Sequence, residues 1–150
     1  MGSIKLEAAA ISTIASTELN SLANNAGALG AEYDNATNLH EFGLFELNVT
    51  FGSAPTAGNT VDLYLIPAPD GTNYDDAVTG ASGQAPAPCY VGSFPLRAVT
   101  TAQKVPLGLG LALVNLPPTK FKAFLLNKSG QAFPASGSTL KLVPYRHQYS

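Results

Sequence analysis

The chain has 150 residues, of which 45% are apolar and only 12% are charged, against about 25% charged residues in an average soluble domain. This length fits one domain with a buried core, and the apolar content excludes intrinsic disorder. The net charge of −2 gives no general attraction to nucleic acid, and the single Cys89 excludes an internal disulfide framework or a cysteine-based zinc site. We therefore expect no metal, no cofactor and no nucleic-acid partner.

Two explanations fit the low charge content. The first is a secreted or otherwise robust β-protein whose surface is covered by serine, threonine, asparagine, glutamine and glycine. The second is a subunit that covers much of its surface with partners, because the cores of protein interfaces are depleted of charge.

The charges are also segregated along the chain. All ten acidic residues lie at or before Asp76, and Lys5 is the only basic residue there, which leaves residues 1–76 at −9. The remaining seven basic residues follow Asp76, with no acidic residue among them. Strands from the two halves could pair and place opposite charges across a sheet, or complementary faces could meet between subunits.

The apolar residues of segment 1–26 are too unevenly spaced for a steady helical stripe. We interpret this segment as an N-terminal arm or a short helix near Thr17–Ala23, with Ser16 or Thr17 as its cap. Residues 27–150 are expected to form a single β-sandwich domain.

Strands are predicted by alternation of apolar and polar residues with a period of two. The clearest case is Phe42–Phe51, and Pro95 within Cys89–Val99 indicates an edge strand or a bulge. Turn residues separate these segments at spacings typical of an all-β, antiparallel, jelly-roll-like sandwich. The other expected strands are Gly27–Asn35, Thr60–Pro67, Lys120–Lys128 and Thr139–Tyr145, with shorter candidates at 102–107 and 109–116.

A long turn-rich loop spans residues 67–88, and loops of this length are often functional. Its acidic and amide side chains could be calcium ligands, although they lack the 12-residue frame of an EF-hand loop. They also suit local turns that bond to their own backbone, and Tyr74 could anchor a protein contact. The candidate interface residues are Asp70, Asn73, Tyr74, Asp75, Asp76 and Tyr64.

Catalytic patterns are nearly absent, so we expect no enzyme. A dyad of Cys89 with His40 or His147 remains open, as does a hydrolase that uses an acidic pair such as Asp75 and Asp76. A cysteine at the start of a strand, however, is more often a small buried apolar residue.

Several runs resemble small structural proteins of tailed bacteriophages. These are residues 44–51, 54–58, 61–67 and 70–74, together with Tyr90–Arg97 and Pro117–Gly130. The general similarity of the sequence spans roughly residues 30–145. The resemblance implies a β-sandwich or jelly roll that decorates or cements a capsid as a homo-oligomer, with the N-terminal segment as an arm toward a neighbouring subunit.

The leading functional hypothesis is therefore a capsid decoration or cement protein that stabilises contacts between capsomers. Its expected partners are the major capsid protein and copies of itself, as a dimer or trimer. The alternative is a tail, neck or fibre-tip component that binds a receptor or glycan, with Tyr64, Tyr74 and Tyr90 around a shallow pocket. No signal peptide or bilayer-length apolar run is evident, so we expect synthesis in a bacterial host cytoplasm, a position on the capsid exterior, and no membrane partner.

Overall fold

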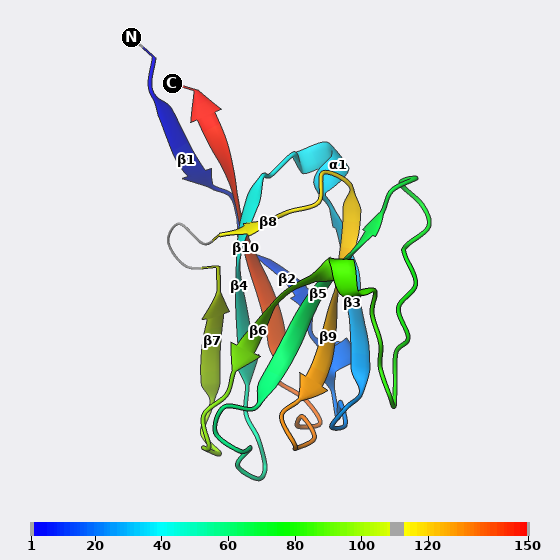
Figure 1. Cartoon of the computed structure of the whole chain (residues 1–150). Helices are drawn as coiled ribbons and strands as arrows, with labels where there is room; N and C mark the ends of the chain where they lie inside the picture. The colour runs from blue at the N-terminus through cyan, green and yellow to red at the C-terminus, as the bar shows by residue number, and fades with distance from the viewer. Residues whose placement is uncertain (1, 109–112, 150) are drawn as a thin grey trace.

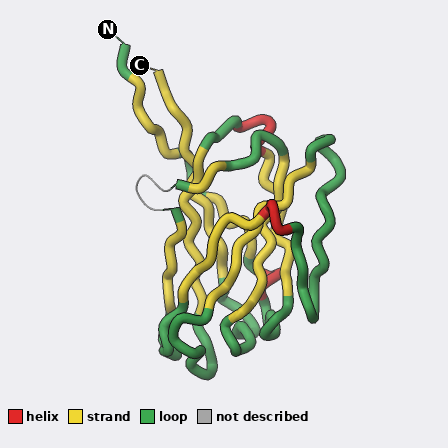
Figure 2. Tube along the Cα trace, in the orientation of Figure 1, coloured by secondary structure: helices red, strands yellow, loops and turns green. Residues whose placement is uncertain are grey.

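Two antiparallel sheets face each other across an apolar core in the computed structural model, which describes residues 2–108 and 113–149 (Figures 1 and 2). The first sheet contains six of the described strands: β1 (Ile4–Ala8), β2 (Ser12–Ala15), β4 (Phe42–Val49), β7 (Gln103–Leu107), β8 (Val114–Asn115) and β10 (Thr139–Tyr149). The second sheet contains β3 (Gly27–Asp34), β5 (Thr60–Ala68), β6 (Tyr90–Pro95) and β9 (Lys120–Lys128). The helical parts of the described chain are single turns: η1 (Thr17–Leu19), α1 (Asn35–Asn38) and η2 (Ala87–Cys89).

The order of the strands is that of a jelly roll. The first sheet runs β2-β10-β4-β7 and the second β3-β9-β5-β6, so consecutive strands mostly alternate between the sheets. At one side of the sandwich β2 lies against β3, and at the other β6 lies against β7. The expected all-β antiparallel sandwich is therefore confirmed.

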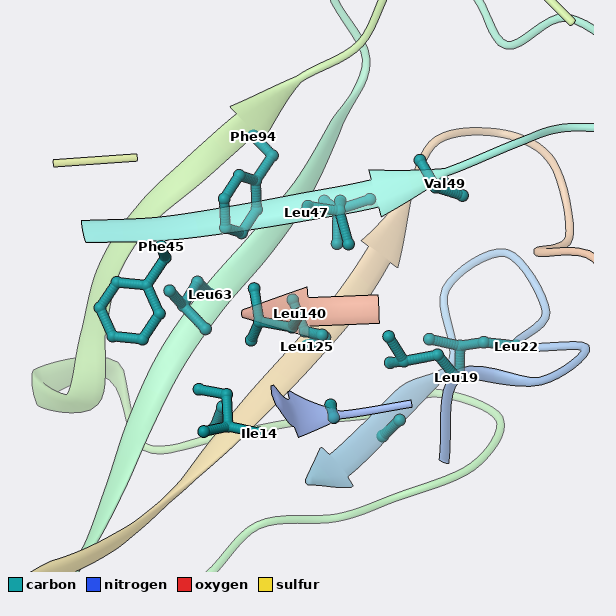
Figure 3. Packing of buried hydrophobic residues seen from close by; sticks show 14 of the residues in the cluster. Ile14, Leu19, Leu22, Phe45, Leu47, Val49, Leu63, Phe94, Leu125 and Leu140 are labelled. Carbon is teal, nitrogen blue, oxygen red and sulfur yellow. The ribbon is translucent and has the colours of Figure 1, made fainter. Parts of the chain in front are cut away.

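The core is built from every second residue of the central strands, as the period of two requires. On β4 the buried positions are Phe45, Leu47 and Val49, and they face Leu63 of β5 and Leu125 of β9 (Figure 3). The segment before β3 also belongs to this core, through Ile14, Leu19 and Leu22.

The first 26 residues divide into three parts. Residues 4–8 form β1, which projects from the sandwich together with the end of β10 (Figure 1). Residues 12–15 form β2 inside the first sheet, and η1 follows directly. Ser16 precedes η1, but its side chain makes no capping hydrogen bond; instead its backbone N–H donates to the Glu18 carboxylate.

Most of the expected strands occur with small differences at their ends. β9 has the predicted bounds, and β6 is an edge strand that ends at Pro95. β10 continues four residues beyond the predicted end at Tyr145, because β1 supplies hydrogen-bonding partners up to Tyr149. Of the candidate strand 109–116, residues 109–112 lie outside the described residues, and only Val114–Asn115 pairs, with β4.

One buried amide links three segments at the lower end of the sandwich. The Asn127 Nδ2 atom donates to the carbonyl oxygens of Leu22, Ala23 and Gln131 at 2.8–3.1 Å, and its Oδ1 atom accepts from the Ser129 N–H. Gly130 follows with a φ of +83°, a conformation that glycine adopts without strain. This turn therefore fixes the loop before β3 against the end of β9.

We predict that Asn127→Asp destabilises the fold more than Asn127→Ala. The alanine leaves buried carbonyl groups without a donor, at a cost of about 1–3 kcal/mol, whereas the aspartate also places an acceptor against three carbonyl oxygens. Urea unfolding measures both changes, with Asn48→Ala on the outer face of β4 as the control. Equal stability of the two Asn127 variants would contradict the assigned donor role.

Candidate interaction surfaces

The outer face of the second sheet is covered by the long loop. Ile66, Phe124 and Leu126 point away from the main core, yet they are buried. Loop residues 74, 77 and 85 and Cys89 of η2 pack against them and form a second, smaller apolar cluster. Phe124 also lies so close to Gly27 that a side chain at position 27 would collide with its ring. The loop is therefore part of the folded core and is not a free arm.

Tyr74 fastens this loop to the sheet. Its hydroxyl donates to the Glu32 carboxylate of β3, and the Lys122 Nζ atom of β9 lies 4.5 Å from the centre of its ring. Burial, followed by the hydrogen bond to Glu32, raises the pKa of Tyr74 to about 12. The same hydrogen bond, together with Lys120, lowers the pKa of Glu32. Backbone bonds between Gly27 and Gly80, in both directions, hold the far end of the loop beside β3 (Figure 1).

The sequence-predicted interface residues occupy different environments. Asp70 closes a turn in which its carboxylate accepts from the Thr72 N–H, the Asn73 N–H and the Asn73 amide, and these bonds lower its pKa. Asp75 and Asp76 are exposed, whereas Tyr74 and Tyr64 are half-buried against the second cluster. The local turn expected for Asp70 and Asn73 is present. Tyr74 points toward the sheet, where it contacts the second apolar cluster.

The outer face of the first sheet carries an apolar stripe, which is half-buried on the sandwich and exposed on β1 and the end of β10. On β4 and β10 the stripe residues alternate with buried ones such as Phe45 and Leu142, so they face away from the core. Strand register places them side by side, and Ile4, Leu6 and Tyr149 are 64%, 49% and 78% exposed. The apolar stripe consists of Ile4, Leu6, Phe42, Leu44, Val143, Tyr145 and Tyr149.

Sequence reasoning missed this stripe because it ended the last strand at Tyr145. The signal was present, since Val143, Tyr145, His147 and Tyr149 continue the alternation of β10, and Ile4 and Leu6 alternate in β1. The lower half of the stripe lies on the sandwich. The upper half lies on the terminal ribbon, formed by β1 and residues 145–149, which stands clear of the body (Figure 1).

Ion pairs join the acidic half of the chain to the basic half. Arg146 Nε lies 3.2 Å from Glu7 across β1 and β10, and Lys120 Nζ lies 3.3 Å from Glu32. His147 Nδ1 is 2.6 Å from Glu41 Oε2, and its ring meets Phe42 edge-on. Glu46 is also registered opposite Lys141. The segregated charges thus meet across strand pairs within one chain.

A cavity of about 390 Å³ lies at the root of the terminal ribbon. Its wall includes His40 and Tyr33, both buried, and the Arg146–Glu7 pair. The Tyr33 hydroxyl is 2.8 Å from His40 Nδ1. Burial lowers the pKa of His40, the nearby Arg146 charge lowers it further, and burial raises the pKa of Tyr33. Both groups are therefore held neutral near pH 7.

The candidate nucleophile and the candidate metal ligands lie in separate environments of the fold. Burial, and then the charge of Asp75, raise the pKa of Cys89, which disfavours the reactive thiolate. Within the described ranges, no group of three or more histidine, cysteine or acidic side chains is arranged to hold a metal ion. His40 is engaged by Tyr33, and His147 lies on the ribbon beside Glu41.

Comparisons with protein-family models, curated proteins and solved structures gave no match. None of the helical turns in residues 2–108 and 113–149 has the length and apolar character that a membrane-spanning helix needs.

We predict that Tyr74→Ala releases the long loop, whereas Tyr74→Phe releases it only slightly. The phenylalanine loses the hydrogen bond to Glu32 but keeps a ring for Lys122 and the second cluster, whereas the alanine loses all three. Proteolysis by a protease of broad specificity measures cleavage within residues 69–86. We expect roughly tenfold faster cleavage for Tyr74→Ala, which corresponds to about 1.4 kcal/mol of loop docking. Equal cleavage of both variants would show that the ring does not hold the loop.

We predict that the free energy of unfolding decreases as the pH is lowered below about 6.5, and that His40 is the cause. The folded-state pKa of His40 is lowered, so the unfolded chain takes up the proton first as the pH drops. The contribution of neutral His40 to the free energy of unfolding is fully present above pH 6.5. It decreases as the pH is lowered toward the folded-state pKa, by at most about 1.4 kcal/mol per pH unit for one proton. Urea unfolding between pH 7.5 and 5.5 should give a flatter profile for His40→Asn. An unchanged slope in that variant would exclude His40 as the cause.

Proposed function

We propose that this protein is a virion structural subunit that binds the outer surface of a bacteriophage capsid as a decoration or cement protein. The observation that carries the proposal is the exposed apolar stripe, which runs from the first sheet onto the terminal ribbon. Exposed contiguous apolar surface marks sites of protein interaction.

The difference between the two outer faces supports a binding role for the first sheet. The long loop covers the apolar residues of the second sheet, but the described residues include no segment that covers the stripe. A chain that covers one outer face with its own loop, and leaves the stripe on the other face half-buried to exposed, has a surface available to a partner. The low charge content of the sequence agrees with this assignment, since interface cores are poor in charge.

A capsid shell suits such a surface because symmetry repeats the same contact many times, so that contacts of moderate strength add up. The partners in this proposal are the major capsid protein and further copies of the chain. The resemblance of the sequence to small structural proteins of tailed bacteriophages points to the same class of partner.

A second candidate is a tail, neck or fibre-tip component that binds a glycan. It is favoured by a cavity of about 670 Å³ on the second sheet, lined by Tyr64, Asn25, Gln84 and Lys128 among others. Tyr90 is 49% exposed, and its ring packs edge-on against Tyr64, with ring centres 5.4 Å apart. Aromatic rings and amides of this kind bind sugars by stacking and hydrogen bonding.

Mass spectrometry of purified particles with copy-number determination separates these two functions. A decoration protein is expected at tens to hundreds of copies per particle, with density spread over the shell in electron micrographs. A few copies confined to one vertex would overturn the capsid assignment and favour the tail component.

We predict that the double variant Tyr145→Ser/Tyr149→Ser weakens binding to shells that lack this protein by more than tenfold. It removes two large side chains of β10 from the stripe, leaves β1 unchanged, and loses about 1.5–3 kcal/mol for each side chain that the shell would fully bury. Val78→Ser is the matched control, because Val78 is 55% exposed but lies in the long loop. A pelleting assay measures bound protein, and equal losses in both variants would refute the stripe as the binding surface.

A further inference from the structure

The outer edge of β1 differs from the other sheet edges of the described structure. β6 and β7 carry Pro95 and Pro106, which cannot donate to an added strand, and these two strands lie against each other. β3 is bordered by β2 and by the loop at Gly80. β1 has neither a proline nor a neighbour on its outer side, and its sequence is Ile-Lys-Leu-Glu-Ala.

An edge of this kind is a template for another strand, because its backbone N–H and C=O groups point outward without partners. The terminal ribbon also stands outside the sandwich as two strands only (Figure 1). Two-stranded ribbons are marginally stable in water, and three or more strands with an apolar face are needed for independent stability. The ribbon therefore gains most from the addition of strands.

We propose that β1 pairs with β1 of a second copy of this chain, antiparallel, about a twofold axis at Leu6. In this register Leu6 lies opposite Leu6, Ile4 opposite Ala8, and Lys5 opposite Glu7. The pairing produces two identical Lys5–Glu7 contacts and a four-stranded ribbon in the order β10-β1-β1-β10.

Charge selects this register over its neighbours. A shift of two residues in one direction places Lys5 opposite Lys5, and in the other direction Glu7 opposite Glu7, both of which are repulsive. A shift of one residue places charged side chains opposite Leu6 and reverses the faces. Lys5 has no ion-pair partner among the residues that the structure describes, whereas Glu7 already contacts Arg146. In the dimer, Glu7 lies between Arg146 of its own chain and Lys5 of the other copy.

The same register aligns the apolar faces. Ile4 and Leu6 of both copies lie on one face of the four-stranded ribbon, so the two apolar stripes become a single surface. This inference rests on the proposed function, which includes self-association of the chain. It identifies the edge of β1 as the place where two copies meet. The edge is distinct from the face that would contact a shell, so purified protein without shells tests it separately. Failure here leaves shell binding intact, and failure of shell binding leaves the dimer intact.

Cysteine cross-linking tests the twofold axis directly. Leu6→Cys and Ile4→Cys are each made in a Cys89→Ala background, oxidised, and in parallel treated with a short bis-maleimide. Residues at the axis have Cβ atoms about 5 Å apart, whereas the two copies of position 4 are four residues apart along the strands, at about 13 Å. We expect Leu6→Cys to form covalent dimers more than tenfold faster than Ile4→Cys. Equal rates, or no dimer from Leu6→Cys, would overturn the proposal.

Charge reversal provides a second test. Lys5→Glu and Glu7→Lys each place like charges opposite each other in their own homodimers, so each is expected to be monomeric by light scattering. Mixed together, they restore two opposite-charge contacts and should form a heterodimer of about twice the 15.5 kDa chain mass. Wild-type protein is expected at that dimer mass. A wild-type monomer or trimer, or a Lys5→Glu variant that dimerises like the wild type, would refute the pairing.

Discussion

β10 has eleven residues with hydrogen-bonding groups on both sides, and no single neighbour is long enough to satisfy them. On one side β4 pairs with Thr139–Tyr145, and on the other β2 pairs with the first part of the strand and β1 with the last. The last part of β10 therefore leaves the sandwich with only β1 beside it. The terminal ribbon, the upper half of the apolar stripe and the open edge all follow from this division of partners.

The two outer faces of the sandwich differ in whether a loop covers them, and the lengths of the connections in the sequence explain the difference. The strands of the second sheet carry Ile66, Phe124 and Leu126 on their outer side, and the eighteen residues between β5 and η2 are long enough to cover them. Tyr74 then bridges an acidic strand and a basic strand through Glu32 and Lys122. The first sheet has no comparable insertion among its described connections, so its apolar outer residues stay at the surface.

The sandwich was predictable from the sequence because residues that face the core recur with a period of two in its central strands, throughout β4 and over part of β9; β9 matches its expected bounds at both ends. The candidate interaction surface was much harder to predict from the sequence than the fold. Alternation predicts that Tyr145 and Tyr149 share a face, but whether that face is covered depends on connections from distant parts of the chain. Tyr74 illustrates the same difficulty: an aromatic residue in a long polar loop was interpreted as an anchor for partners, and only tertiary contacts place it against Phe124 and Leu126. Leu19 and Leu22 were missed as core residues for the opposite reason, since the irregular chain that carries them has no period.

The order of the strands has a consequence for how the molecule is made. β9 and β10 are the central strands around which both sheets are arranged, and they are synthesised after all the others. Until they emerge from the ribosome, residues 1–76 carry a charge of −9, and Arg97 and Lys104 are the only basic residues made after Asp76. Like charges disfavour compact states of a chain, and here the residues that reduce this repulsion come last. β9 and β10 supply five of the eight basic residues together with the central position of each sheet, so neutralisation of the acidic half and completion of both sheets depend on the same two strands.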